Sequence, residues 1–180
     1  VQSLSPTDFA GGRLHGEHIG PQPFAQWQQA FDPLLTRGAR NYWKSHNFTE
    51  LSDGALDSMI EYAGKLPLPE CEIFVGHIEG AANEVPSDAT AYRHRDAKFV
   101  MNVHGRWTEA AQDEEGIRWC REFFAAAAPY ASAGAYVNFM TDDESDRIGA
   151  VYGENYDRLV KIKRMYDPLN FFHLNQNIKP

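Results

Sequence analysis

Tyr136 and Asn138 are a pair of side chains whose types and spacing suit chemistry. They alternate within the segment 135–139, which is predicted as a short strand, and alternating residues of a strand point to the same face. A phenol and an amide on one face can line a pocket together. The pKa of a tyrosine side chain is normally about 10. A role as base near neutral pH would therefore need a nearby positive charge such as Arg93 or Arg95. The alternative is a core tyrosine with a satisfied hydroxyl group and an amide at a strand edge.

Histidine and aromatic side chains add further candidates. His94 can exchange a proton near neutral pH, although a surface histidine with satisfied hydrogen bonds is the simpler interpretation. Tyr42 and Trp43 can form a wall of a binding site, or they can pack in an ordinary core. His104 lies among the polar residues of a predicted strand and is expected to be solvated.

A metal centre is not predicted. His15 and His18 are close in sequence, but Gly16 weakens a helix there and no third ligand is near, so a flexible tail is favoured. A metal-dependent hydrolase that uses His77, His94 and His104 is an alternative from another class of enzyme, although the spacing of these histidines matches no ligand pattern.

The composition limits the class of protein. With 180 residues, of which 43% are hydrophobic, the chain can build one substantial core. The formal net charge of −8 disfavours a nucleic-acid-binding surface. No apolar run of about 20 residues occurs and no signal peptide is indicated, so no membrane association is predicted. Cys71 and Cys120 are interpreted as buried free thiols, which agrees with a cytoplasmic location; the oligomeric state stays open.

These side chains must be held by a sheet and its helices. One predicted strand, 99–107, alternates between apolar and polar residues, so one of its faces belongs to the core and the other is polar. Ser52 is placed to cap a helix. The pattern predicts an α+β fold, in which an antiparallel sheet is covered on one face by helices. The expected elements are an irregular lead-in at 1–23, strands at 41–48, 71–76, 89–94, 99–107 and 135–139, and helices at 24–31, 52–66, 113–128 and 145–166, the last bent near Gly153.

A longer motif lies at the C-terminus. A helix that contains Tyr152, Asn155, Arg158-Leu159 and Lys161 is followed by Tyr166-Asp167-Pro168-Leu169-Asn170-Phe171-Phe172 and then by Gln176-Asn177-Ile178. This pattern resembles, in register, the C-terminal segment of the berberine bridge enzyme-like family of FAD-linked oxidases. The resemblance extends upstream through 41–44, 90–95 and 135–139, and so covers nearly everything from Phe24 onward.

The resemblance implies a function for the chain. It would be the substrate-binding, C-terminal half of an FAD-dependent oxidoreductase, with a substrate domain at 24–150 and a C-terminal segment at 151–180. That segment would pack on the same domain and on an N-terminal FAD-binding domain, which lies outside this sequence and binds most of the FAD. The fragment alone is therefore expected to be inactive, and it contains no dinucleotide-binding fingerprint.

The resemblance also implies site residues. Relatives carry Tyr-x-Asn-Tyr on the strand at 136–139 and use the second tyrosine as a base; here Phe139 holds that position and cannot accept a proton, which leaves Tyr136 as the candidate. The side-chain amides near the C-terminus supply paired donors and acceptors. The implied cofactor contacts are Tyr136, Asn138, Asn175 and Gln176, and the implied substrate contacts are Tyr42, Trp43, Tyr92, His94 and Arg95.

Two functions follow from these observations. The first is oxidation of an alcohol, a sugar or a secondary metabolite by hydride transfer to flavin. The second is a small-molecule-binding module that kept the fold and lost catalysis, which both Phe139 and the missing flavin half permit.

Overall fold

The computed structural model describes residues 20–30, 32–35, 37–132 and 134–180, and the chain divides into two units at residues 37 and 38. The first unit contains the helix α1 (Phe24–Gln29), followed by a 3-10 turn at Asp32–Leu34. The helix expected near Phe24 is therefore confirmed. His15 and His18 lie outside the described residues.

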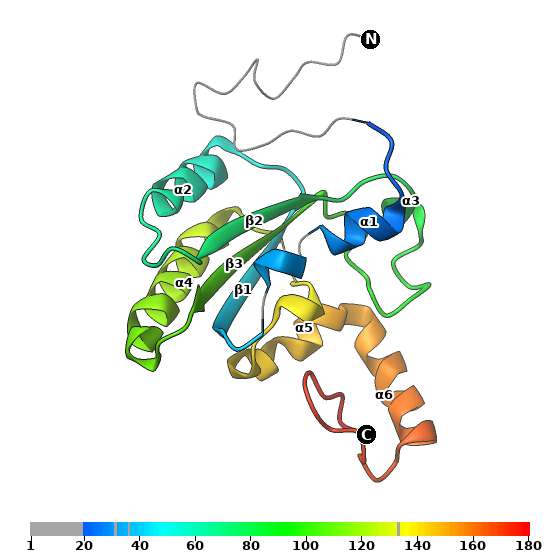
Figure 1. The fold of residues 1–180 in the computed structure, drawn as a ribbon. Coiled ribbons are helices and arrows are strands. Elements are labelled where there is room, and N and C mark those ends of the chain that lie inside the picture. Colours follow the sequence, from blue (N-terminus) through cyan, green and yellow to red (C-terminus); the bar gives the residue numbers. More distant parts are fainter. Residues whose placement is uncertain (1–19, 31, 36, 133) are drawn as a thin grey trace. The chain divides into compact units, whose positions relative to one another are not determined.

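The second unit is built on a three-stranded antiparallel sheet (Figure 1). Its strands are β1 (Arg40–Phe48), β2 (Glu72–His77) and β3 (Phe99–Trp107), and β3 is central. The register places His104 opposite Trp43 of β1 and opposite Glu72 of β2. The three strands expected at these positions, and the α+β class, are confirmed.

Helices α2 (Asp53–Ala63) and α4 (Asp113–Ala127) build the core against the sheet. The Ser52 hydroxyl accepts a hydrogen bond from the Ala55 backbone nitrogen at 3.4 Å, which confirms the predicted cap. Each fully buried Phe or Met side chain contributes about 1.5–3 kcal/mol. The buried cluster consists of Phe48, Ala55, Met59, Leu68, Cys71, Met101, Val103, Trp107, Trp119, Cys120, Phe123 and Ala127.

The face of β3 that is directed away from the core is not solvated. The prediction that His104, which lies on this face, is solvated is therefore wrong. The His104 side chain is 2% exposed. The Trp43 ring lies 4.8 Å from its ring, and Glu72 and Asn41 lie at hydrogen-bonding distance from its two ring nitrogens. Side chains of the two neighbouring strands therefore bury His104, although the alternation pattern predicted that it is exposed to solvent.

Two of the expected strands are absent from the described residues. Segment 89–94 consists of a bend and irregular chain, and the Asn155 amide donates to the backbone oxygens of Thr90 and of the preceding Ser87. Segment 135–139 contains a 3-10 turn at Val137–Phe139 instead of a strand. Both predictions were wrong because a short alternation of residue types does not require a neighbouring strand.

Two helices follow a capped turn near the C-terminus. They are α5 (Ile148–Tyr152) and α6 (Tyr156–Tyr166), which extends away from the sheet (Figure 1), and a short helix α3 (Ala81–Glu84) lies earlier in the chain. Gly153 separates α5 from α6 with a φ of +50°, which confirms the predicted interruption.

Replacing Gly153 with Ala should destabilise the chain by about 1–3 kcal/mol, because left-handed backbone strains residues with a Cβ. An added Cβ would also meet the Arg93 side chain at 2.1 Å. Urea unfolding measures the loss. Gly149→Ala is the matched control, since nothing lies within 4 Å of a Cβ at that helical position. Equal stability of the two variants would contradict this account.

A buried histidine links stability to pH. The His46 ring stacks on Phe124 with centroids 4.1 Å apart, and a ring nitrogen lies 2.8 Å from the Phe124 backbone oxygen. Burial lowers the pKa of His46, and Arg147 and Glu144 are the charged groups that act on it. A lowered folded-state pKa stabilises the protein at neutral pH, and this contribution is lost as the pH falls below about 6.5.

The urea concentration at the midpoint of unfolding should therefore decrease as the pH is lowered from 7 to 5. His46→Gln keeps a hydrogen-bond donor without titrating, so this variant should lose less stability over the same range. An identical pH dependence in the two proteins would exclude His46 as the cause.

Candidate functional site

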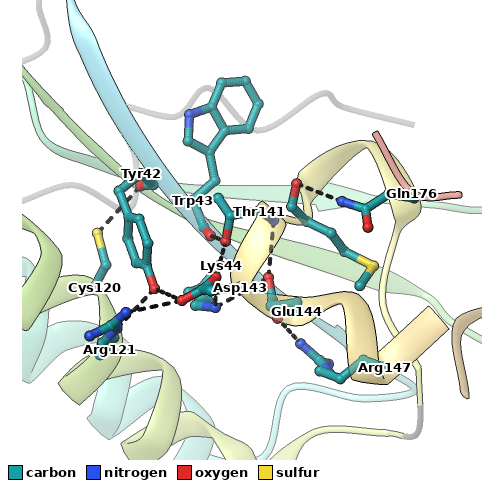
Figure 2. A network of polar contacts seen from close by, with 11 residues as sticks. Tyr42, Trp43, Lys44, Cys120, Arg121, Thr141, Asp143, Glu144, Arg147 and Gln176 are labelled. Carbon is teal, nitrogen blue, oxygen red and sulfur yellow. Dashed lines mark hydrogen bonds and ion pairs between the residues drawn. The ribbon is translucent and has the colours of Figure 1, made fainter. Parts of the chain in front are cut away.

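A network of polar contacts centres on Lys44 of β1 (Figure 2). The Lys44 ammonium lies 2.8 Å from Asp143 Oδ1 and 3.4 Å from Glu144 Oε2, and its side chain is 7% exposed. Burial acts to lower the pKa of Lys44, but the hydrogen bond with Asp143 and the charge of Glu144 outweigh it and raise that pKa. The lysine is therefore charged, and a buried charge of this kind needs such partners.

Asp143 receives hydrogen bonds from several elements (Figure 2). Lys44, the Thr141 hydroxyl at 2.5 Å and the Tyr42 hydroxyl at 2.5 Å donate to its carboxylate, and Arg121 of α4 lies 3.1 Å away. Burial acts to raise the pKa of Asp143, but these hydrogen bonds hold it well below its usual range. The ionised carboxylate thus joins β1, α4 and the segment that begins at Thr141.

Glu144 fixes the turn that follows. It is 3% exposed, accepts a hydrogen bond from the Thr141 backbone nitrogen at 3.3 Å and pairs with Arg147. The network therefore sets the position of the chain directly after the 3-10 turn at Val137–Phe139.

A cavity of about 580 Å³ opens beside the network, next to β1, which is an edge strand of the sheet. It is named the polar cavity below, because most of its lining residues carry polar side chains. The Gln176 amide donates to the Met140 backbone oxygen at 3.3 Å, so the C-terminal tail reaches the wall of this cavity. Its lining contains three of the predicted site residues, Tyr42, Trp43 and Asn138, together with Asn41, Arg121, Met140, Thr141, Asp142 and Asp143.

A second cavity, of about 330 Å³, lies beside the same turn and is mainly apolar. It is named the Phe139 cavity below. Its lining contains the predicted residues Tyr92 and Tyr136, together with Phe74, Gly76, His77, Ile78, Val100 and Phe139.

The 3-10 turn brings Tyr136 and Asn138 together. The Asn138 Nδ2 atom donates to the Tyr136 hydroxyl oxygen at 2.8 Å. Tyr136 lines the Phe139 cavity and Asn138 lines the polar cavity, so their hydrogen bond links the linings of the two cavities. The pair is close for a different reason from the predicted strand alternation.

His94 and Arg95 line neither cavity. A His94 ring nitrogen lies 2.8 Å from the Val151 backbone oxygen, and the residue is 8% exposed. The Arg95 guanidinium donates to Ala82 and Thr90 and lies 4.9 Å from the Tyr92 ring centroid. Its charge therefore acts on Tyr92, where burial raises the pKa and Arg95 opposes that rise.

Only some of the side-chain amides near the C-terminus have hydrogen-bond partners among the described residues. Asn175 is exposed and adopts a φ of +57°. The Asn177 side-chain oxygen is buried without a hydrogen-bond partner among the described residues, and so is that of Asn170. Such unpaired atoms can accept a hydrogen bond from a group that docks there.

The Lys44 network was not predicted from the sequence. Lys44 alternates with Tyr42 and His46 on the strand face that is directed to the core, and a lysine at such a position signals a buried partner. The acidic run Asp142-Asp143-Glu144 was the available partner.

Within the described part of the chain, no three His, Cys, Asp or Glu side chains gather where a metal ion could be held. The helices of the same part are too short or too polar to cross a membrane. Cys71 and Cys120 are buried free thiols, as the composition suggested, and burial raises the pKa of Cys120 to about 12.

Comparisons with known proteins agree on one family. The family described as "Berberine and berberine like" matches residues 135–179. An uncharacterized FAD-linked oxidoreductase of Bacillus subtilis is 30% identical over 98% of this chain, and an FAD-linked oxidoreductase of Dictyostelium discoideum is 29% identical over 88% of it. The chain spans only 39% and 35% of the lengths of these two relatives.

A solved structure supports the fold. The berberine bridge enzyme of Eschscholzia californica matches 85% of this chain and 36% of its own with a TM-score of 0.71, at 21% sequence identity. This likeness concerns the fold alone.

Proposed function

Because this chain belongs to the berberine bridge enzyme-like family of FAD-linked oxidoreductases, we propose that it is the substrate-binding part of an enzyme that oxidises an alcohol, a sugar or a secondary metabolite by hydride transfer to FAD. The observation that carries the proposal is the hydrogen-bonded pair of Tyr136 and Asn138, each of which lines one of the two cavities. A phenol and an amide at that position can orient a hydroxyl group and accept its proton.

An N-terminal domain outside this chain would hold most of the FAD. The apolar surface of the C-terminal region supports such a partner, because contiguous exposed apolar side chains mark interaction sites. Six large apolar residues there are 72–91% exposed: Met165, Tyr166, Leu169, Phe171, Phe172 and Leu174.

The residues present fit the polar edge of a flavin ring. That edge offers both donors and acceptors, which side-chain amides can match. Asn138, at the polar cavity, and the tail amides of Asn175 and Gln176 are the proposed contacts. The buried, unpaired oxygen of Asn177 supports a polar group docking beside the tail.

When bound, FAD supplies the hydride acceptor. In the proposed mechanism this chain holds the substrate hydroxyl near Tyr136, and the Tyr136 oxygen accepts the proton. The hydrogen bond that Asn138 donates to this oxygen holds it in place for the transfer. Tyr92 is the poorer candidate base, because burial raises its pKa.

Anaerobic mixing of the full-length flavoprotein with a panel of primary alcohols, sugars and aromatic alcohols tests the proposal. At least one class should bleach the flavin absorption in a saturable manner. A flavoprotein that no member of the panel reduces, but that binds some of them, would favour the binding-module function over the oxidoreductase.

A further inference from the structure

The Phe139 cavity has a more specific lining than a general apolar pocket. Four aromatic residues contribute to it: Phe74 from β2, Tyr92, Tyr136 and Phe139. Val100 of β3 and Ile78 complete the apolar wall. Four separate chain segments thus place aromatic or aliphatic side chains around one space.

The rings stand nearly perpendicular to one another. Phe139 lies 5.1 Å from the Tyr136 ring at 82° and 6.4 Å from the Phe74 ring at 74°. The Tyr92 and Tyr136 rings are 6.2 Å apart at 82°. Such a lining presents both ring faces and ring edges, which are the two surfaces that a further aromatic ring contacts.

The cavity offers few polar partners. Its polar side-chain atoms belong to Tyr92, Tyr136 and His77, and the Tyr136 hydroxyl already accepts from Asn138. A sugar would bury several hydroxyl groups there, and each unpaired buried hydroxyl costs about 1–3 kcal/mol. An apolar ring has no such cost.

The floor of the cavity depends on a glycine. Gly76 lines the cavity, and a Cβ there would lie 3.0 Å from the Phe74 ring and 3.3 Å from Val100, two other lining residues. The volume of about 330 Å³ is at the small end of small-molecule sites, which begin at about 300 Å³. It suits one ring or two fused rings rather than a larger polycycle.

The polar cavity offers more polar partners than the Phe139 cavity. Asn41, Asn138, Thr141 and Asp142 contribute polar groups to its lining. A substrate that spans both cavities would therefore carry a ring at one end and a polar group at the other.

We infer that the substrate is an aromatic alcohol with one or two rings. Its ring lies in the Phe139 cavity, and its hydroxyl group points to the Tyr136–Asn138 pair. This inference rests on the proposed function and names the substrate class of the same site.

The test uses 2-naphthalenemethanol as a fluorescent probe, titrated into the 180-residue chain without flavin. Saturable binding is expected. Phe139→Leu keeps an apolar side chain but removes the ring, and should weaken binding by roughly 3- to 10-fold. Tyr92→Leu serves as a second cavity variant, and circular dichroism checks that each variant is folded.

Phe172→Leu is the matched control, because Phe172 is 76% exposed and lies outside the cavity. It should bind the probe as the unaltered chain does. If Phe139→Leu and Phe172→Leu weakened binding of the probe equally, the probe would be binding to the exposed tail. That result would overturn the inference. Absence of saturable binding, or displacement of the probe by methyl glucoside, would overturn it as well.

The full-length flavoprotein separates this inference from the proposed function. If sugars reduce the flavin and aromatic alcohols do not, the oxidoreductase stands and the substrate class is wrong. If the probe binds through Phe139 and Tyr92 but no compound reduces the flavin, the ligand class stands and the oxidation is wrong.

Discussion

Tyr136→Phe in the full-length flavoprotein should slow flavin reduction by about 100- to 10,000-fold, the range for loss of a general base. The substitution keeps the ring in the Phe139 cavity and removes the oxygen that accepts from Asn138. Binding of the substrate should change much less than the rate. Anaerobic stopped-flow measurement over a range of substrate concentrations separates the two quantities.

Tyr130→Phe is the matched control, because Tyr130 lies beside Gly54 of α2, away from both cavities. It should keep the full rate. A Tyr136→Phe enzyme that keeps both its rate and the pH dependence of that rate would show that another group accepts the proton.

Lys44→Met should destabilise the chain by about 3 kcal/mol, the lower end of the cost of breaking a buried ion pair. Methionine fills a similar volume but leaves Glu144, which is 3% exposed, without one of its cations. The value stays at the lower end because the Asp143 side chain is 37% exposed and retains Arg121. Urea unfolding at pH 7 measures the difference.

Lys65→Met provides the same chemical change at an exposed pair. Lys65 and Glu61 are 59% and 58% exposed, so the loss of stability should be much smaller than at Lys44, because water screens exposed ion pairs. If the two lysine variants unfolded at the same urea concentration, the Lys44 network would have no special role in stability.

The sheet was predictable where alternation and burial agree. In β3 the residues Met101 and Val103 face the core, as their period of two indicates. His104 follows the same alternation, yet its burial depends on Trp43, Asn41 and Glu72, which are far away in sequence. Sequence periodicity assigns a face but does not tell what covers it.

The helix α2 illustrates the same limit. Its existence and its cap at Ser52 followed from local signals. In the structure Leu56 and Ile60 are 40% and 70% exposed, while Ala55 and Met59 are buried. The contact with α4 sets this rotation, and no local pattern contains it.

The candidate site was only partly predictable. Tyr136 and Asn138 were chosen correctly as neighbours, but a 3-10 turn and not a strand joins them. Arg95, proposed as a charge that could act on Tyr136, instead lies over the ring of Tyr92. Long flexible side chains reach partners that only tertiary structure can identify.

Two visible absorption spectra test whether this chain is the substrate-binding part of a flavoenzyme. One is of the protein expressed with its full upstream sequence, and the other is of this 180-residue chain after incubation with FAD and removal of free cofactor. The account predicts flavin absorption bands in the long form and none in the short form. A colourless long form, or a short form that retains FAD by itself, would contradict the assignment of this chain as the substrate-binding part of a flavoenzyme.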